Sequence, residues 1–91
     1  MSKKRTKIEI IRDILGVIKS KNGKIKPTHI LYKSNLSYQM MDEYLTELKK
    51  GGLIIEEQAK KGKTYSLTAK GFKFLDQYSL ISDFMTSFGL E

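Results

Sequence analysis

The chain has 91 residues, 40% of them hydrophobic and 30% charged, and a formal net charge of +7 at pH 7. This length suits one small domain with a modest core, so we expect a single domain that gains stability from a partner subunit. The absence of cysteine excludes a disulfide framework, a thiolate nucleophile and a cysteine zinc site, and the lone His29 cannot form a metal site unaided.

The positive charge lies in two blocks. Residues 1–33 hold ten Lys and Arg against two acids, and residues 59–71 hold four Lys against none, whereas residues 34–58 and 72–91 are net acidic. Such blocks attract nucleic acid and acidic membrane surfaces, although a chain rich in Lys, Ile and Glu can also be simply well solvated. Charged residues interrupt the apolar stretch after Met1–Lys7, so we expect no signal sequence, no membrane span and a soluble intracellular protein.

The first predicted helix begins after Thr6, because Thr6 and Glu9 have the spacing of a capping box. Its apolar residues recur at steps of three and four, and Asn22-Gly23 ends it. Residues 24–26 alternate and predict a very short strand, after which Pro27 marks the start of a second helix through Lys33.

The third predicted helix runs over residues 38–50. Ser37 is its expected N-cap, and Leu36 is expected to pack on Met41 as a hydrophobic staple. Its expected buried face consists of Met41, Tyr44, Leu45 and Leu48, and Gly51-Gly52 end it.

Two strands, residues 53–55 and 64–67, are predicted to form a hairpin around a polar loop over residues 59–63, in which Gly62 supplies the turn. Thr68 is expected to cap the last helix. The apolar residues of that helix step by four, three, four and three, which is the spacing of a heptad seam: Phe74, Tyr78, Ile81, Met85 and Phe88.

This order of elements predicts a mainly α (α+β) chain, a winged helix-turn-helix with a β-hairpin wing and a C-terminal dimerisation helix. Three segments, Lys33-Ser34-Asn35-Leu36-Ser37-Tyr38, Tyr44-Leu45-x-x-Leu48-x-x-x-Gly52-Leu53-Ile54 and Tyr65-x-Leu67-Thr68-x-Lys70-Gly71, resemble the small basic archaeal winged-helix DNA-binding proteins and the related predicted archaeal transcriptional regulators. The resemblance covers residues 3 to about 78. It implies a homodimer through a C-terminal antiparallel coiled coil and double-stranded DNA binding, either regulatory or chromatin-like.

We therefore expect residues 1–68 to form the DNA-binding domain with a basic N-terminal arm, and residues 69–91 to form the dimerisation element. The first turn of the third helix should approach the bases, because neutral donors lie there at the positive end of the helix dipole. The arm and the wing tip should neutralise phosphates. The expected DNA-contacting residues are Lys3, Lys4, Arg5, Lys7, Lys33, Ser34, Asn35, Ser37, Tyr38, Gln39, Glu43, Thr46, Lys50, Lys60, Lys61 and Lys63.

Two of these residues allow more than one interpretation. Glu43 either accepts a hydrogen bond from a cytosine amino group, weakens tight non-specific binding, or is solvated and reaches no base. Tyr38 either contacts a phosphate or packs against the turn.

The expected dimer interface consists of Phe74, Tyr78, Ile81, Phe84, Met85 and Phe88. Exposed aromatic residues at heptad spacing usually meet a partner. The alternative is that part of this seam covers the wing and the first helix within one chain.

No nucleophile, base and oxyanion site can be assembled from these residues, so we expect a non-enzyme without cofactor, metal or small-molecule ligand, in the cytoplasm and associated with the nucleoid. The competing function is a protein-interaction module of a transcription complex that uses the acidic third helix, with Asp42, Glu43 and Glu47. A membrane-surface role is weaker, because the basic blocks do not share a helix with a large apolar face.

Overall fold

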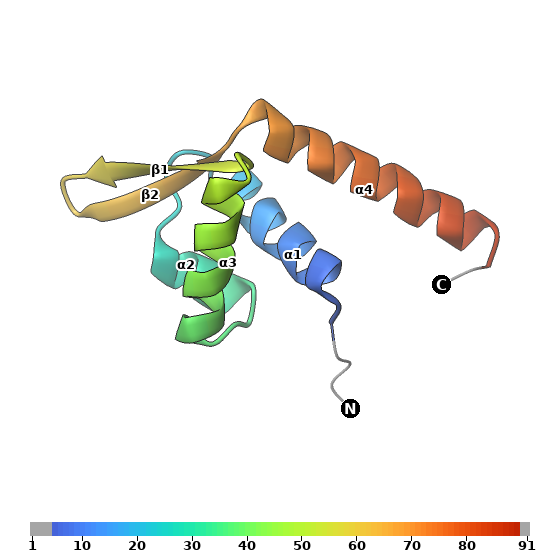
Figure 1. Cartoon of the computed structure of the whole chain (residues 1–91), viewed down its shortest axis with the longest axis horizontal. Helices are drawn as coiled ribbons and strands as arrows, with labels where there is room; N and C mark the ends of the chain where they lie inside the picture. Colours follow the sequence, from blue (N-terminus) through green and yellow to red (C-terminus); the bar gives the residue numbers. More distant parts are fainter. Residues whose placement is uncertain (1–4, 90–91) are drawn as a thin grey trace.

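A computed structural model describes residues 5–89 of the chain (Figure 1). The elements, in chain order, are α1 (Lys7–Ser20), α2 (Pro27–Lys33), α3 (Tyr38–Lys50), β1 (Ile54–Ala59), β2 (Gly62–Leu67) and α4 (Ala69–Ser87). The two strands pair antiparallel as a hairpin. In Figure 1 the hairpin and α4 extend in opposite directions from the body formed by α1, α2 and α3. This mainly helical arrangement with one hairpin confirms the predicted winged-helix fold class.

Side-chain caps define the starts of three helices, as predicted. The Thr6 hydroxyl accepts a hydrogen bond from the Glu9 amide, and the Thr6 amide donates to the Glu9 carboxylate at 2.8 Å, which completes the capping box. The Ser37 hydroxyl accepts from the Met40 amide at the start of α3. Thr68 caps α4 in the same way. Helix α3 has the predicted bounds.

The hairpin is longer than the sequence predicted. Pairing continues from Ile54 opposite Leu67 to Ala59 opposite Gly62, so the loop contains only Lys60 and Lys61. The outer half of the hairpin is mostly solvent-exposed, and polar residues such as Glu57 and Gln58 are compatible with a strand there. The hydrophobic pattern therefore could not mark its length. The short strand predicted at residues 24–26 is reduced to a single bridge between Ile25 and Tyr65.

The core forms around α1, whose Ile14, Leu15 and Ile18 have no exposed surface. Leu36 and Met41, the expected staple pair, are both buried in this core. Its other members are Ile10, Ile25, Ile30, Leu45, Leu48, Ile54, Tyr65 and Leu67. Each of the six elements contributes at least one partly or fully buried residue, so burial of apolar surface joins the body, the hairpin and the start of α4.

Helix α4 packs on the core only at its start. Gly71 is buried, Phe74 and Leu75 pack against the core, and residues 79–89 are all exposed. At Gly71 the backbone of α4 comes so close to the Leu53 carbonyl oxygen that a Cβ atom would overlap it. A residue without a side chain is therefore required where α4 leaves the body.

The Glu56 carboxylate on β1 ties the hairpin to the end of α3. One oxygen accepts hydrogen bonds from Lys49 Nζ and the Tyr65 hydroxyl, each at 2.9 Å, and the other lies 3.6 Å from Lys63 Nζ. The bonds from Lys49 and Tyr65 hold the pKa of Glu56 below its ordinary value. Burial, followed by the bond to Glu56, raises the pKa of the Tyr65 hydroxyl.

Replacement of Gly71 by Ala should destabilise the fold by about 1–3 kcal/mol, because the new methyl group overlaps the Leu53 carbonyl. Gly16→Ala is the matched control, since Gly16 lies inside α1 with open space around its Cβ position. The control should stabilise the protein by about 0.5–1 kcal/mol. Urea unfolding of both variants measures these changes, and equal effects would contradict the close approach.

Glu56 should also give the fold an acid-sensitive component. A carboxylate whose folded pKa is lowered contributes stability above its ordinary value of 4.5 and loses that contribution as the pH falls through the folded pKa. We expect Glu56→Gln to lower stability at neutral pH and to weaken its dependence on pH in the acid range. Glu57→Gln, an exposed neighbour without an ion pair among residues 5–89, is the control in urea unfolding at several pH values. Identical pH profiles for both variants would rule out this role.

Candidate nucleic-acid interface

The turn between α2 and α3 presents polar side chains at the start of α3. Asn35 has a left-handed backbone with φ of 53°, a conformation that Asn tolerates better than most residues. Leu36 then turns inward into the core, whereas Asn35, Ser37, Tyr38 and Gln39 are exposed. The structure therefore brings these four predicted contacts together on the surface.

Ser34 is the exception among the predicted contacts of this turn. Its side chain is 1% exposed, so the hydroxyl has no surface from which to contact DNA. The polar composition of the turn gave no sign of this burial.

Most of the acids on α3 are not paired. Of the acids on α3, only Glu47 forms an ion pair within residues 5–89, with Lys7 at 2.7 Å. The hydrogen bond from Lys7 to Glu47 raises the pKa of the Lys7 ammonium group. Asp42 and Glu43 are exposed and form no ion pair in the same range. The predicted outward residues Thr46 and Lys50 are exposed too, so α3 presents a mixed surface after its first turn.

The described residues of the N-terminal arm pair with the chain's own carboxylates. Arg5 forms an ion pair with Asp13 at 2.7 Å, and Lys7 forms the pair with Glu47. Lys3 and Lys4 lie outside the described residues. The two described cations of the arm are thus partly neutralised by the protein itself.

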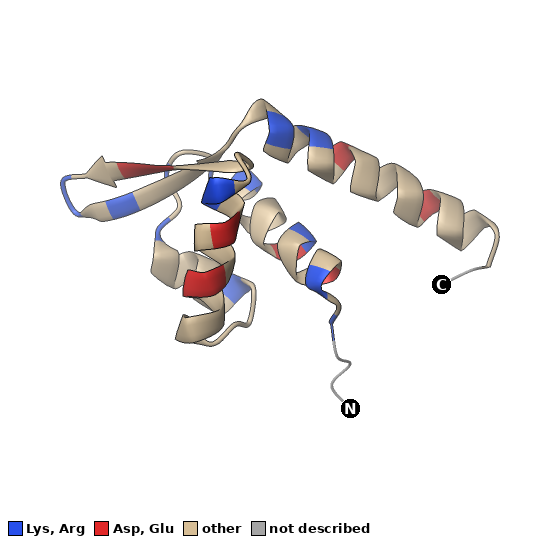
Figure 2. Cartoon of the chain, in the orientation of Figure 1, with Lys and Arg blue, Asp and Glu red and all other residues tan. Residues whose placement is uncertain are grey.

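At the wing, the three predicted lysines occupy two different places. Lys60 and Lys61 form the exposed turn, where Figure 2 shows basic residues at the hairpin tip, and Gly62 follows with φ of 121°. Lys63 lies on β2 opposite Gln58, 3.6 Å from the Glu56 carboxylate, so its predicted place in the loop is wrong, whereas its predicted DNA contact stays a prediction. In the part of the chain that the structure describes, Lys60, Lys61, Lys33 and Lys50 form no ion pair.

Tyr32 on α2 was not predicted as a site residue, yet it is 77% exposed just before the turn. Tyr38, at the first position of α3, is 72% exposed, so its ring is not packed against the turn. Helix α2 has only seven residues, too few for the spacing of its apolar residues to reveal which face is exposed.

The predicted dimer residues divide into two groups. Phe74 packs against the core and stacks on Tyr78, whose ring also lies under the Arg12 guanidinium at 5.2 Å. Ile81, Phe84, Met85 and Phe88 are exposed, and the rings of Phe84 and Phe88 lie 4.6 Å apart. Part of the seam therefore covers the chain's own body, which is the alternative that the sequence left open.

A cleft of about 510 Å³ lies between α1, α3 and the start of α4. Its lining includes Ile11, Tyr44, Leu48, Leu53 and Phe74, with Lys70 and Lys73 from α4. The Lys70 ammonium donates to the Gly51 carbonyl at 2.7 Å. The cleft is thus mainly apolar, and Glu47 and Gln77 add an acidic and a neutral polar side chain to the two lysines.

Between Arg5 and Gly89, no helix is both long and apolar enough to cross a membrane. Among the same residues, no group of three or more His, Cys, Asp or Glu side chains is placed to hold a metal ion.

Comparison with solved structures finds the same fold in bacterial and archaeal proteins. Sso10a-2, a DNA-binding protein from Sulfolobus solfataricus, is 25% identical with a TM-score of 0.70, over 91% of this chain and 87% of that chain. MepR, a transcription regulator of the Staphylococcus aureus multidrug efflux pump MepA, is 19% identical with a TM-score of 0.77, over 86% of this chain. A structure of the MepR–DNA complex gives a TM-score of 0.71 at 19% identity.

The chain spans 59% of the MepR chain. No curated protein matches the chain. The family model of the winged helix-turn-helix, in contrast, matches residues 4–86. The chain therefore belongs to the winged helix-turn-helix family.

Proposed function

We propose that this protein binds double-stranded DNA and acts as a transcriptional regulator or a chromatin-type protein in the cytoplasm, associated with the nucleoid. Two features of the same molecule carry the proposal. The first turn of α3 is polar and exposed, and the hairpin tip holds two lysines that form no ion pair in residues 5–89. Sso10a-2 and MepR, which share the fold, are a DNA-binding protein and a transcription regulator. The proposed role is a binding role and requires no cofactor.

The first turn of α3 supplies the base-facing contacts in this proposal. Asn35, Ser37 and Gln39 offer neutral donors and acceptors at the positive end of the helix dipole, so they can bind phosphate oxygens or base edges. Tyr38 and Tyr32 flank the same turn along the chain with exposed side chains. Thr46 and Lys50 extend the contact along the exposed side of α3.

Phosphate neutralisation belongs to Lys60, Lys61 and Lys33, with Lys3 and Lys4 in the arm. Glu43 lies among the DNA-facing residues without a cationic partner in residues 5–89. It therefore either accepts a hydrogen bond from a cytosine amino group or limits non-specific binding. The carboxylate of Glu47 is already compensated by Lys7.

The exposed half of α4 is the proposed dimerisation element, so residues 1–68 bind DNA and residues 69–91 pair with a second copy. A stripe on α4 begins in the cleft with Lys70 and Gln77 and continues at helical spacing through Ile81, Phe84 and Phe88. A second α4 lying antiparallel on this stripe would bring its Phe84 and Phe88 to the cleft of the first chain. The contact is self-complementary, as a two-fold dimer requires.

A second candidate function is a protein-interaction module, and the exposed carboxylates of Asp42 and Glu43, without an ion pair in residues 5–89, favour it. Under this alternative, Glu43→Gln leaves DNA affinity unchanged. Under the DNA-binding proposal, the same substitution strengthens non-specific binding, because a negative charge leaves the surface that faces the phosphates.

Replacing Lys60 and Lys61 together by Ala should weaken binding to every duplex sequence. The slope of log affinity against log salt should fall by about 0.9 for each phosphate that the variant no longer neutralises. Fluorescence anisotropy with a labelled random-sequence duplex at several salt concentrations measures both quantities. The control removes the same charge from exposed positions outside the turn, the wing and the cleft, Lys19→Ala with Lys21→Ala. Equal effects of the two double substitutions would contradict the role of the wing.

The proposed dimer can be tested by cross-linking, because the chain has no cysteine of its own. Antiparallel pairing that places Phe74 opposite Phe88 puts Ile81 at the two-fold axis, so Ile81→Cys should form a covalent dimer on oxidation. Ser79→Cys, on the opposite side of α4, should not. Non-reducing electrophoresis measures the amount of covalent dimer for both variants, and an Ile81→Cys protein that stays monomeric after oxidation would refute this dimer.

A further inference from the structure

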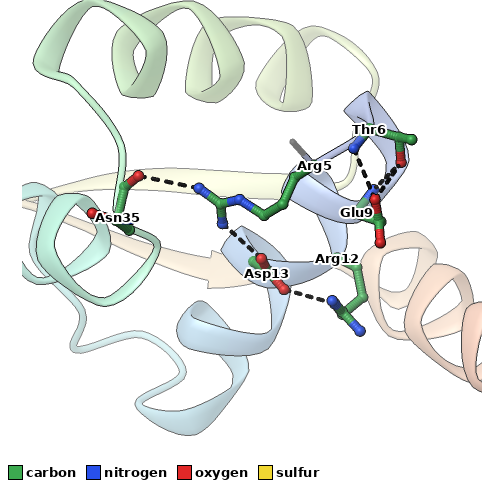
Figure 3. Close-up of polar contacts among 6 residues, drawn as sticks. All are labelled: Arg5, Thr6, Glu9, Arg12, Asp13 and Asn35. Carbon is green, nitrogen blue, oxygen red and sulfur yellow. Dashed lines mark hydrogen bonds and ion pairs between the residues drawn. The ribbon is translucent and has the colours of Figure 1, made fainter. Parts of the chain in front are cut away.

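Arg5 links two parts of the protein that are far apart in the sequence. One guanidinium nitrogen donates to the backbone carbonyl of Asn35 at 3.1 Å, across 30 residues, and the other pairs with the Asp13 carboxylate at 2.7 Å (Figure 3). A planar guanidinium presents donors on separate nitrogens in fixed directions, whereas the ammonium group of Lys has rotatable donors on a single nitrogen. The segment before α1 is thereby attached to the turn of the helix-turn-helix.

The Asp13 carboxylate holds two guanidinium groups at once. One oxygen accepts from Arg5 and the other accepts from Arg12 Nε at 2.7 Å (Figure 3). The side chains of Arg5 and Asp13 are 29% and 26% exposed, so water only partly screens their contact. Removal of the Asp13 charge would release both arginines.

The carbonyl that Arg5 holds belongs to the residue whose backbone conformation defines the turn. Asn35 has φ of 53°, and the chain then passes through buried Leu36 to Ser37, the N-cap of α3. The direction of the Asn35 peptide therefore sets where α3 begins. Because Arg12 also lies over the ring of Tyr78, the same set of contacts reaches from this turn to α4.

We propose that Arg5 and Asp13 are positioning residues for DNA binding. They hold the Asn35 turn, and with it the first turn of α3, in the orientation in which these residues meet the duplex. Arg5 thus acts through the turn, whereas the sequence assigned it to a phosphate. This inference rests on the proposed DNA-binding function.

The two roles of Arg5 make opposite predictions for charge-changing variants. If Arg5 contacted a phosphate, Asp13→Asn would free a cation and strengthen binding, and Arg5→Lys would preserve the contact. In the positioning role, Asp13→Asn weakens binding although it removes an acid from a protein that binds a polyanion. Arg5→Lys weakens binding although the charge is kept. We expect affinity to fall about three- to tenfold for each variant.

The experiment measures affinity for a labelled random-sequence duplex at several salt concentrations. The positioning role predicts that Arg5→Lys leaves the slope of log affinity against log salt unchanged. It also predicts that the double variant, Arg5→Lys with Asp13→Asn, binds DNA no more weakly than the weaker single variant, because both residues hold the same turn. Asp76→Asn, an exposed acid of α4 without an ion pair in residues 5–89, is the control and should not weaken binding. Circular dichroism checks that each variant is folded. If Asp13→Asn is unfolded, the conservative variant Arg5→Lys is sufficient for the test.

Tighter binding by Asp13→Asn, or wild-type affinity for Arg5→Lys, would overturn the positioning role and leave the proposed function intact. A wild-type chain that binds no duplex even at low salt would overturn the proposed function, and the positioning role with it.

Discussion

Ile14, Leu15 and Ile18 on α1 are completely buried, and α2, the hairpin and α4 all pack against this helix. Burial of this one apolar face is the constraint on which the arrangement depends. Within residues 5–89, α2, the hairpin and α4 each pack more extensively on α1 than on one another. This burial leaves α3 with one face in the core and its first turn at the surface. It also leaves the hairpin tip and the far half of α4 extending from the body in opposite directions (Figure 1).

Charge pairing then decides which cations remain available for a partner. The carboxylates of Asp13, Glu47 and Glu56 are occupied by Arg5 and Arg12, by Lys7, and by Lys49 and Lys63, respectively. Except for the Arg12–Asp13 pair within α1, these pairs connect different segments of the fold, so several basic residues contribute to the structure before they can bind a ligand. The lysines of the wing tip have no such partner within residues 5–89, which is why they carry the electrostatic part of the proposed function.

Local signals in the sequence predicted the local structure well. The caps at Thr6, Ser37 and Thr68 each involve atoms within three residues, so sequence spacing is sufficient to find them. The length of the hairpin was missed because its outer half has no buried face. The pairs of Arg5 with Asn35 and Lys7 with Glu47 span 30 and 40 residues and exist only once the core has formed. Spacing in the sequence therefore could not reveal that Arg5 and Lys7 have partners within the chain.

The central claim is that DNA meets the first turn of α3 and the wing tip together. Its most direct test is a nuclear magnetic resonance titration of the isotope-labelled protein with a short random-sequence duplex, which reports every backbone amide at once. The claim predicts that the largest shifts fall on residues 33–39 and 58–63, while residues 79–87 of α4 change little. Shifts confined to α4 and the cleft, or no shifts at low salt, would contradict it.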